Sequence, residues 1–213
     1  MSMIDNIYKG VIQEVELENL VSIRIARKPG RVEAHPFDSS LPYMNIQTLE
    51  LGEQNQYAEY SGYVIGKNDL VIVKDGHRSG KVFRGQEGIA ASTMAILSPK
   101  NEHIHIDYIY CYLIYCYEDF QSRLRGELIA HLDMNYLRQM RIPLPDVEKQ
   151  RAIAVKYQHL ETSANHMRDL ASQLVDLSTK LANNELKKKG EALTLKVDMM
   201  LKAWLHQIFE KAV

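Results

Sequence analysis

Ile142-Pro143-Leu144-Pro145-Asp146 is the stretch that decides the architecture of this chain. Before it, short apolar runs alternate with turns that contain glycine and proline, which is typical of β-structure. After it, apolar residues recur at spacings of three and four, as in a long amphipathic helix. The two prolines end the first pattern, and Asp146 is a suitable N-cap for the second. The sequence therefore predicts an α+β protein with a β-rich domain at residues 1–145 and a helical region at residues 146–213.

The helical region carries one nearly continuous apolar row from Ile153 to Leu181, with Ser178 as its polar break. This row predicts a helix of about 40 residues, roughly 60 Å long. Lys187-Lys-Lys-Gly190 is typical of a helix C-terminus, since cations and glycine both suit that position. A second amphipathic helix over residues 195–209 is expected to cover about half of the first. The pattern therefore favours self-association of the long helix, while packing against the last helix alone stays open.

Local patterns before the junction predict several strands and short helices. Apolar runs at residues 20–25, 69–73 and 89–97 each indicate one strand. Val71 to Phe83 is predicted to form a hairpin, because Asp-Gly and Ser-Gly turn pairs lie between its apolar ends. Apolar spacing over residues 106–124 favours helix, and a short helix is expected to start near Asp133.

Composition limits the possible classes of protein. The chain has 213 residues and a net charge of −1, so any affinity for nucleic acid must come from a local patch. Cys111 and Cys116 are too few for a disulfide framework and have no companion ligands for zinc, which predicts free thiols in a reducing compartment. The first ten residues lack the apolar core of a signal peptide, and no run approaches the roughly 20 apolar residues of a membrane span. We therefore expect a cytoplasmic protein without membrane contact.

Catalytic motifs are not found in the sequence. An amino-methyltransferase needs an Asn/Asp-Pro-Pro-Tyr/Phe motif and a glycine-rich loop after a strand, and neither occurs. Glu185-Leu-Lys187 imitates part of a nuclease motif, but chance explains it better. His103 and His105 lack a third committed metal ligand. The sequence predicts no catalytic residue, cofactor or metal site, and a hydrolase with an unrecognised site is the remaining catalytic alternative.

Several short motifs occur in a characteristic order between about residues 16 and 185. They are Glu16-Leu-Glu-Asn-Leu20, Leu41-Pro-Tyr-Met-Asn-Ile46, Gly66-Lys-Asn-Asp-Leu-Val71, Lys74-Asp-Gly76, Gly80-Lys-Val82, Ala90-Ala-Ser92, Ile129-Ala-His-Leu132 and Ile142-Pro-Leu-Pro145 with Gln150. In this order the chain resembles the specificity subunits of type I restriction–modification systems. The Pro-Leu-Pro junction followed by a helix start with Gln150 is the most specific element. Asn45 departs from the family pattern, which often has Arg at that position.

The resemblance implies a function in DNA recognition. In that family a target-recognition domain reads one half of a split DNA sequence, helices set the spacing to a second domain, and methyltransferase subunits perform the chemistry. This chain has the length for one recognition domain and one spacer, so it resembles a half-sized subunit that dimerises through its long helix. A two-fold dimer would read an interrupted palindrome. The expected partners are double-stranded DNA, a methyltransferase subunit, a second copy of the chain and, as an open further partner, a restriction subunit. A coiled-coil adaptor without DNA readout is the alternative.

Two basic loops are the candidate DNA contacts. Between Lys67 and Arg84 five cations accompany two acids, a local charge of +3. His77 and Arg78 lie at the predicted turn, and arginine suits guanine O6 and N7 in the major groove. A second loop around Pro29-Gly30 suits phosphate binding. A solvated loop is the alternative for both, and the family resemblance leaves a framework role open for Lys74 and Lys81. The candidate DNA-binding residues are Lys74, His77, Arg78, Lys81, Arg84, Arg27, Lys28 and Arg31.

Overall fold

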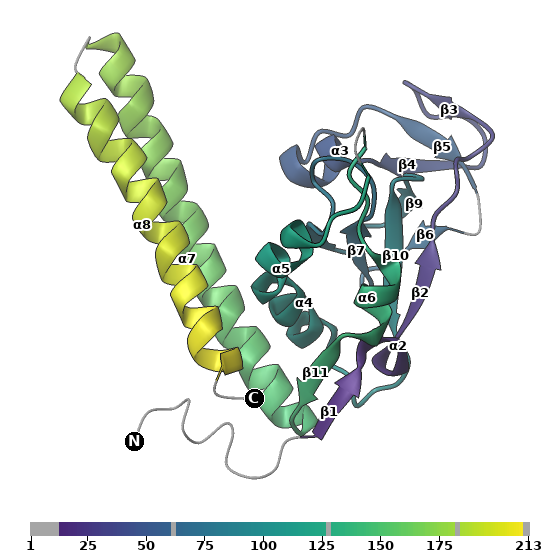
Figure 1. Cartoon of the computed structure of the whole chain (residues 1–213). Coiled ribbons are helices and arrows are strands. Elements are labelled where there is room, and N and C mark those ends of the chain that lie inside the picture. The colour runs from purple at the N-terminus through teal and green to yellow at the C-terminus, as the bar shows by residue number, and fades with distance from the viewer. Residues whose placement is uncertain (1–12, 61–62, 127–128, 182–183, 211–213) are drawn as a thin grey trace.

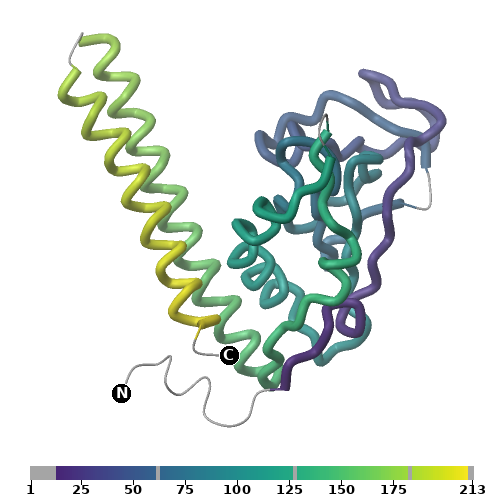
Figure 2. Tube along the Cα trace, viewed as in Figure 1, coloured from purple at the N-terminus to yellow at the C-terminus, as the bar shows by residue number. Residues whose placement is uncertain are grey.

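The computed structural model describes residues 13–60, 63–126, 129–181 and 184–210. The first ten residues, considered above for a signal peptide, lie outside this range. The described chain forms a globular head (residues 13–145) and a pair of long antiparallel helices, called the rod (Figure 1). Figure 2 shows that the lower part of the rod lies against the head and that its far end stands away from it. The α+β class predicted from the sequence is confirmed.

A four-stranded antiparallel sheet forms the centre of the head. Its order is β2 (Val21–Ile25), β10 (Met94–Pro99), β7 (Leu70–Val73) and β8 (Val82–Arg84). The predicted strands at residues 20–25 and 69–73 are confirmed, and β7 pairs with β8 as the predicted hairpin.

A second sheet covers one face of the central sheet. Its order is β3 (Val32–Glu33), β5 (Tyr57–Glu59), β4 (Ser40–Met44), β9 (Gly88–Ala90) and β6 (Val64–Ile65). The short helix α3 (Ile46–Leu51) follows β4 and is capped by Asn45, whose side chain accepts a hydrogen bond from the Thr48 amide at 2.9 Å. The residue that departs from the family pattern therefore has a local structural role, since asparagine is a favoured N-cap.

The apolar run 89–97 does not form the single strand that its pattern predicts. It divides between β9 in the second sheet and β10 in the central sheet. Ala91 donates its amide to the Met44 carbonyl, and the Met94 amide returns to the Ala91 carbonyl, both at 3.0 Å. The prediction was wrong because both halves are equally apolar, so the pattern carries no sign of the bend between them.

The remaining helices of the head lie on the other face of the central sheet and at its base. The predicted helix at 106–124 is two helices, α4 (Ile106–Tyr115) and α5 (Tyr117–Ser122). The expected short helix is α6 (Met134–Gln139), and Asp133 caps it by accepting the amides of Asn135 and Tyr136.

A small sheet joins the beginning of the described chain to the junction. β1 (Gln13–Glu16) pairs antiparallel with β11 (Arg141–Leu144), and the short helix α2 (Leu17–Leu20) follows β1. Pro143 lies within β11 opposite Glu14. This pairing places the start of the rod directly beneath the head.

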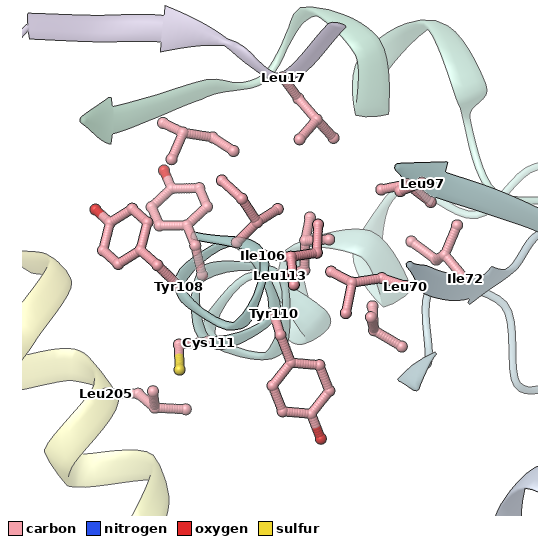
Figure 3. Packing of buried hydrophobic residues seen from close by; sticks show 14 of the residues in the cluster. Leu17, Leu70, Ile72, Leu97, Ile106, Tyr108, Tyr110, Cys111, Leu113 and Leu205 are labelled. Atoms are coloured by element: carbon pink, nitrogen blue, oxygen red, sulfur yellow. The ribbon is translucent and has the colours of Figure 1, made fainter. Parts of the chain in front are cut away.

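The two faces of the central sheet border different hydrophobic cores. Leu70 and Ile72 of β7 face α4, whereas Val71 between them belongs to the core shared with the second sheet. Figure 3 shows Leu70, Ile72 and Leu97 on one side of α4, with Leu205 of the rod near Cys111 on another. Helix α4 is therefore a layer between the sheet and the rod, with both of its sides buried.

The rod consists of α7 (Val147–Lys180) and α8 (Asn184–Phe209). Asp146 caps α7 as predicted, accepting the Lys149 amide at 2.9 Å. The predicted end of the long helix at Lys187-Lys-Lys-Gly190 is wrong, because that segment lies inside α8. Gly190 is buried against α7, where a Cβ atom would lie 2.8 Å from the Ala171 carbonyl oxygen. The glycine therefore permits close helix packing instead of ending a helix.

Contacts between α7 and α8, and of both helices with the head, bury part of the predicted apolar row. On α7 the buried members are Ile153, Tyr157, Ala164, Ala171 and Ser178, and on α8 they are Gly190, Val197, Leu201, Leu205, Ile208 and Phe209. The expectation that the last helix covers only half of the first is wrong, since α8 follows α7 along nearly its whole length (Figure 1). Apolar side chains nevertheless remain exposed along one side of α7 and at its C-cap: Met167, Leu170, Leu177 and Leu181, with Leu174 half-buried among them. No helix in the described part of the chain is both long and apolar enough to span a bilayer.

Candidate nucleic-acid interface

The two predicted basic loops lie at the same edge of the central sheet. The loop of residues 27–31 follows the carboxyl end of β2, and the loop of residues 74–81 follows the carboxyl end of β7. These strand ends are neighbours of one residue, Met94 of β10, which pairs with Val73 and accepts the Ala26 amide at 3.0 Å. The fold thus brings together two groups of cations that are about 45 residues apart in the sequence.

The hairpin loop is held firmly against the rest of the head. Gly76 and Gly80 adopt positive φ values of 101° and 88°, which favour glycine. Ser79 is fully buried and donates its hydroxyl to the carbonyl oxygens of Gly76 and Ala130 at 2.7 and 3.1 Å. At the turn itself, His77 is exposed and Arg78 is half-buried. The loop is a fixed platform from which these two side chains reach solvent.

Most cations of the hairpin loop have an acidic partner within the head. Lys74 pairs with Asp75. Glu50, at the end of α3, accepts Lys81 at 2.6 Å and Arg78 at 3.3 Å. The hydrogen bond from Lys81 lowers the pKa of Glu50 below its usual value, with further help from the charge of Arg78. Asp75 is already counted in the local charge of +3, so Glu50 is the acid that a neighbouring element adds to this loop, and it is shared by two cations.

The loop of residues 27–31 differs in its ion pairing. Arg27 and Lys28 are exposed, and neither forms an ion pair with any residue in the described ranges. Arg31 pairs with Glu33 at 2.6 Å and lies over the Phe37 ring at 4.2 Å. The Gly30 amide donates to Glu59 at 2.8 Å, which ties the loop to β5. Arg27 and Lys28 can therefore bind an anion without first breaking an ion pair to the described part of the head.

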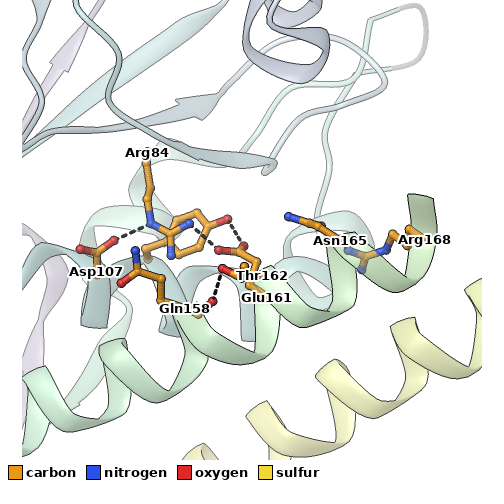
Figure 4. Close-up of polar contacts among 8 residues, drawn as sticks. Arg84, Asp107, Gln158, Glu161, Thr162, Asn165 and Arg168 are labelled. Carbon is orange, nitrogen blue, oxygen red and sulfur yellow. Dashed lines mark hydrogen bonds and ion pairs between the residues drawn. The ribbon is translucent and has the colours of Figure 1, made fainter. Parts of the chain in front are cut away.

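Arg84 lies apart from both loops, on the side of the head that faces the rod. Its Nε donates to Asp107 of α4 and its Nη1 to Glu161 of α7, both at 2.6 Å (Figure 4). Arg84 is the last residue of β8, and its side chain contacts α4 and α7, whereas Lys81 and Arg78 lie at the other end of the hairpin. Of the predicted DNA-binding residues, Arg84 is the one that the fold separates from the rest.

The histidines near Asp107 and the two cysteines, which the sequence analysis considered, belong to the folded head. Asp107, near His103 and His105, is bound to Arg84, and across the described ranges no three His, Cys, Asp or Glu side chains are placed to hold a metal ion. Cys111 is a buried free thiol and Cys116 a half-buried one.

Two important residues had little signal in the sequence. Glu50 pairs with two cations of the hairpin from a helix that no pattern marked as acidic. Glu161 reaches Arg84 across 77 residues. Each acts through a partner that is distant in the sequence, so only the folded chain shows the pairing.

Comparison with known proteins agrees with the arrangement of head and rod. The family model described as "Type I restriction modification DNA specificity domain" matches residues 11–170. Among curated proteins, the type I restriction enzyme MjaVIII specificity subunit of Methanocaldococcus jannaschii is 27% identical over 143 residues, which cover 66% of this chain and 33% of that protein.

Solved structures share the fold at low sequence identity. The HsdS subunit from Thermoanaerobacter tengcongensis has a TM-score of 0.57 and 15% identity, and covers 95% of this chain and 46% of its own. A structure on complex assembly and conformational transition of the type I R-M system has a TM-score of 0.61 and 15% identity, with 93% and 46% covered. The corresponding S subunit from M. genitalium has a TM-score of 0.51 and 16% identity, with 77% and 43% covered.

The match thus spans about a third of the curated relative and less than half of each solved chain. The match covers a larger share of this chain, because the family model includes the head, the Pro-Leu-Pro junction and more than half of α7. The chain therefore belongs to the family of type I restriction–modification DNA specificity domains.

Proposed function

We propose that this chain reads one half-site of a bipartite DNA sequence and directs a methyltransferase to it. Residues 1–145 would form the target-recognition domain, and residues 146–213 the spacer and dimerisation region. The observation that carries the proposal is the family match over a head whose two basic loops share one sheet edge. In this proposal the chain performs no catalysis, and the chemistry belongs to the methyltransferase, with a restriction subunit as a further partner.

The loop of residues 27–31 is the proposed phosphate contact. Arg27 and Lys28 are exposed cations without an acidic partner among the described residues. Phosphate contacts set the position of a protein on DNA and much of its affinity. Arg31 adds a third cation from the same loop, although it would first exchange its exposed pair with Glu33.

The turn of the hairpin is the proposed base-reading element. His77 is exposed, and the Arg78 side chain is 43% exposed despite its contact with Glu50 at 3.3 Å. Glu50 keeps Lys81 at 2.6 Å, so Arg78 can exchange Glu50 for a guanine edge without leaving that carboxylate unpaired. Lys74 and Lys81 support the turn from either side, each held by an acid. Arg84 is left out of this surface because it is bound to α4 and α7.

A second copy of the chain is the proposed partner of the rod. The exposed apolar row on α7 includes Leu170 at 44% and Leu177 at 45% exposure, which lie one heptad apart in the sequence. The chain also covers only 46% of two solved relatives with the same fold, so two copies would match one relative in length. Two heads related by a two-fold axis would read an interrupted palindrome.

Selection from randomised DNA, with and without the methyltransferase, tests the recognition proposal. We expect a split, palindromic sequence to be enriched. Arg78→Ala should lose about 1–3 kcal/mol at the preferred site and relax one position of it. Replacement of both Arg27 and Lys28 by Ala should instead weaken binding to all sequences and reduce the salt dependence by about two charges.

The control for these variants replaces Lys180 and Lys188 by Ala, because both lysines are exposed on the rod far from the head. It should bind like the parent chain. If no sequence is enriched in either condition, the chain is a protein-binding adaptor and the recognition proposal fails.

The mass in solution tests the dimer proposal. We expect a dimer that becomes a monomer when Leu170 and Leu177 are both changed to Glu, since two charges would then enter an apolar contact. Leu51→Glu, at an exposed position on α3, is the matched control and should leave the dimer intact. A dimer that survives the double change would place the interface elsewhere. A monomeric parent chain would leave the exposed row to the methyltransferase.

A further inference from the structure

A polar network joins the head to the rod beside their shared apolar core. The Arg84 guanidinium lies over the Tyr110 ring at 4.0 Å, between Asp107 on one side and Glu161 on the other. Glu161 also accepts the Tyr110 hydroxyl at 3.0 Å through its second oxygen. One carboxylate of α7 is thus held by two side chains of the head. Planar, multiply bonded contacts of this kind fix orientation more strictly than a single point charge does.

The network is more enclosed than the second ion pair that joins head and rod among the described residues. Its side chains are 35% exposed at Arg84 and 20% at Glu161, and the Arg84 Nη2 atom is covered by protein. Lys202 of α8 pairs with Glu118 of α5, but these side chains are 53% and 72% exposed. Burial lowers the pKa of Arg84, yet the bond to Asp107 and the nearby Tyr110 and Glu161 outweigh it and hold the pKa above its usual range. The guanidinium therefore stays charged and keeps both carboxylates.

Glu161 also occupies a special place along α7. Beyond it, every hydrogen bond and ion pair found for described residues of α7 stays within the rod, such as Arg168 with Asp198 at 2.7 Å. The base of the rod is fixed by other contacts, with Tyr157 against Tyr110 and buried Phe209 against Tyr108. Glu161 is therefore the last polar support before the rod leaves the head.

We propose that Arg84 and Glu161 are positioning residues that lock the angle between head and rod, and thereby select the spacing between the two half-sites. The first part concerns the chain alone, and the second rests on the proposed function. Arg84 belongs to the recognition machinery without touching DNA, which differs from its prediction as a DNA-binding residue.

A small change of angle is enough to affect spacing. From Glu161 to Lys180 the helix continues for roughly 29 Å at 1.5 Å per residue. A tilt of about 10° at Glu161 moves the far end by about 5 Å, because the displacement grows with this length. That exceeds the rise of one base pair, about 3.4 Å. A rod that tilts freely by this amount cannot distinguish spacers that differ by one base pair.

The distance between spin labels on the head and the far end of the rod tests the lock directly. The labels are placed by Gln47→Cys on α3 and Lys180→Cys on α7, in a Cys116→Ser background, and labelled chain is diluted with unlabelled chain. We expect one narrow distribution for the parent chain. Glu161→Gln and Arg84→Met should broaden or shift it by about 5 Å, the displacement that a tilt of about 10° gives over this length.

Two further variants make the result decisive. Tyr110→Phe removes only the hydroxyl bond to Glu161 and should broaden the distribution less, so the lock can be tested even if Arg84→Met does not fold. Arg168→Met breaks an ion pair within the rod whose arginine is 33% exposed, close to the 35% of Arg84, and should change nothing. If Glu161→Gln and Tyr110→Phe both keep the parent distribution, the lock is refuted.

Selection from half-sites joined by spacers of different length tests the consequence for DNA. The parent chain should enrich one spacer, and Glu161→Gln should also enrich spacers one base pair shorter and longer, with the half-sites unchanged. If both proteins enrich the same single spacer, the network does not select spacing. If the parent enriches no split sequence at all, the proposed function fails, while the label distances still decide whether the lock exists.

Discussion

At the scale of single residues, Gln150 connects the head to the start of the rod. Its side-chain oxygen accepts the His105 amide at 2.9 Å, and its nitrogen donates to the carbonyls of His103 and Pro145 at 3.1 and 2.9 Å. The residue is almost fully buried. One amide thus pairs three backbone groups that would otherwise lack partners, at the point where the loop before α4 meets the first turn of α7.

Replacing Gln150 should destabilise the fold strongly. Gln150→Ala leaves the three backbone groups without their partner, and we expect a loss of about 2–4 kcal/mol in the free energy of unfolding. Gln173→Ala, at an exposed position on the same helix, should change it by less than about 0.5 kcal/mol. Urea unfolding of both variants measures the difference. Equal stability of the two would mean that water replaces the Gln150 side chain.

Residue roles were predictable from the sequence where the partner is local. Asp146 and Asp133 were predicted at helix starts, and both cap the helices that follow them. Gln150 was noted as part of a motif, but its bonds to residues 103–105 depend on the fold. The placement of Arg84 could not be predicted, because its partners lie 23 and 77 residues away. Whether the basic loops bind DNA stays a prediction.

At the scale of elements, the close crossing of α7 and α8 depends on Gly190. A Cβ atom there would lie 2.8 Å from the Ala171 carbonyl oxygen and 2.9 Å from a methyl group of Val175. Both distances are too short for ordinary contact. One of these neighbours is backbone and belongs to a helix, so it cannot move by itself.

Gly190→Ala should therefore separate the two helices and weaken the rod. Alanine favours helix over glycine by up to about 1 kcal/mol, but overpacking costs about 1–3 kcal/mol, so we expect a net loss of stability. Ser172→Ala, at an exposed position on α7, gains helix propensity without a clash and should be neutral or slightly stabilising. Thermal or urea unfolding compares them. A stabilised Gly190→Ala variant would contradict the close crossing.

Elements were predictable where one pattern ran without interruption. The strands β2 and β7, the hairpin and the start of α7 follow from local alternation, turn residues and caps. The end of α7 was not predictable, because the lysines and glycine at 187–190 suit both a helix end and a helix crossing. Only the approach of Ala171 to Gly190 distinguishes the two, and that contact is a property of the folded rod.

At the scale of the whole molecule, the layer between sheet and rod is rich in phenols and thiols. Burial raises the pKa of Tyr110 and Tyr112 above the usual range, and it raises the pKa of the Cys116 thiol from 9.0 to about 12. Burial, with a hydrogen bond to Asp119, also raises the pKa of Tyr136 to about 12. These groups are neutral in the folded protein, and charging them would place anions in the helical layer of the head, with Tyr112 packed against Phe209 of the rod.

Alkaline pH should consequently loosen the molecule. The unfolded chain releases thiol protons above about pH 9 and phenol protons above about pH 10, whereas the folded chain still holds them. Unfolding then releases protons, so the stability is fully present below about pH 9 and falls as the pH rises toward 12. Urea midpoints at about pH 7.5 and about pH 10.5 measure this loss.

Cys116→Ser is the matched variant, because it removes one titrating group and should reduce the loss. Equal midpoints at both pH values would mean that these side chains titrate as in the unfolded chain.

The separation of two hydrophobic cores by one sheet has a consequence for how new specificities arise. Val71, Met94 and Ile96 face the core shared with the second sheet, while their neighbours in the same strands face the core that includes α4 and the rod. Mutations in the loops of the second sheet, and in the side chains beneath them, can accumulate without changing the core that packs against the rod. If the proposed function holds, a lineage can acquire a different DNA preference by changing one half of the head while it keeps the contact between head and rod.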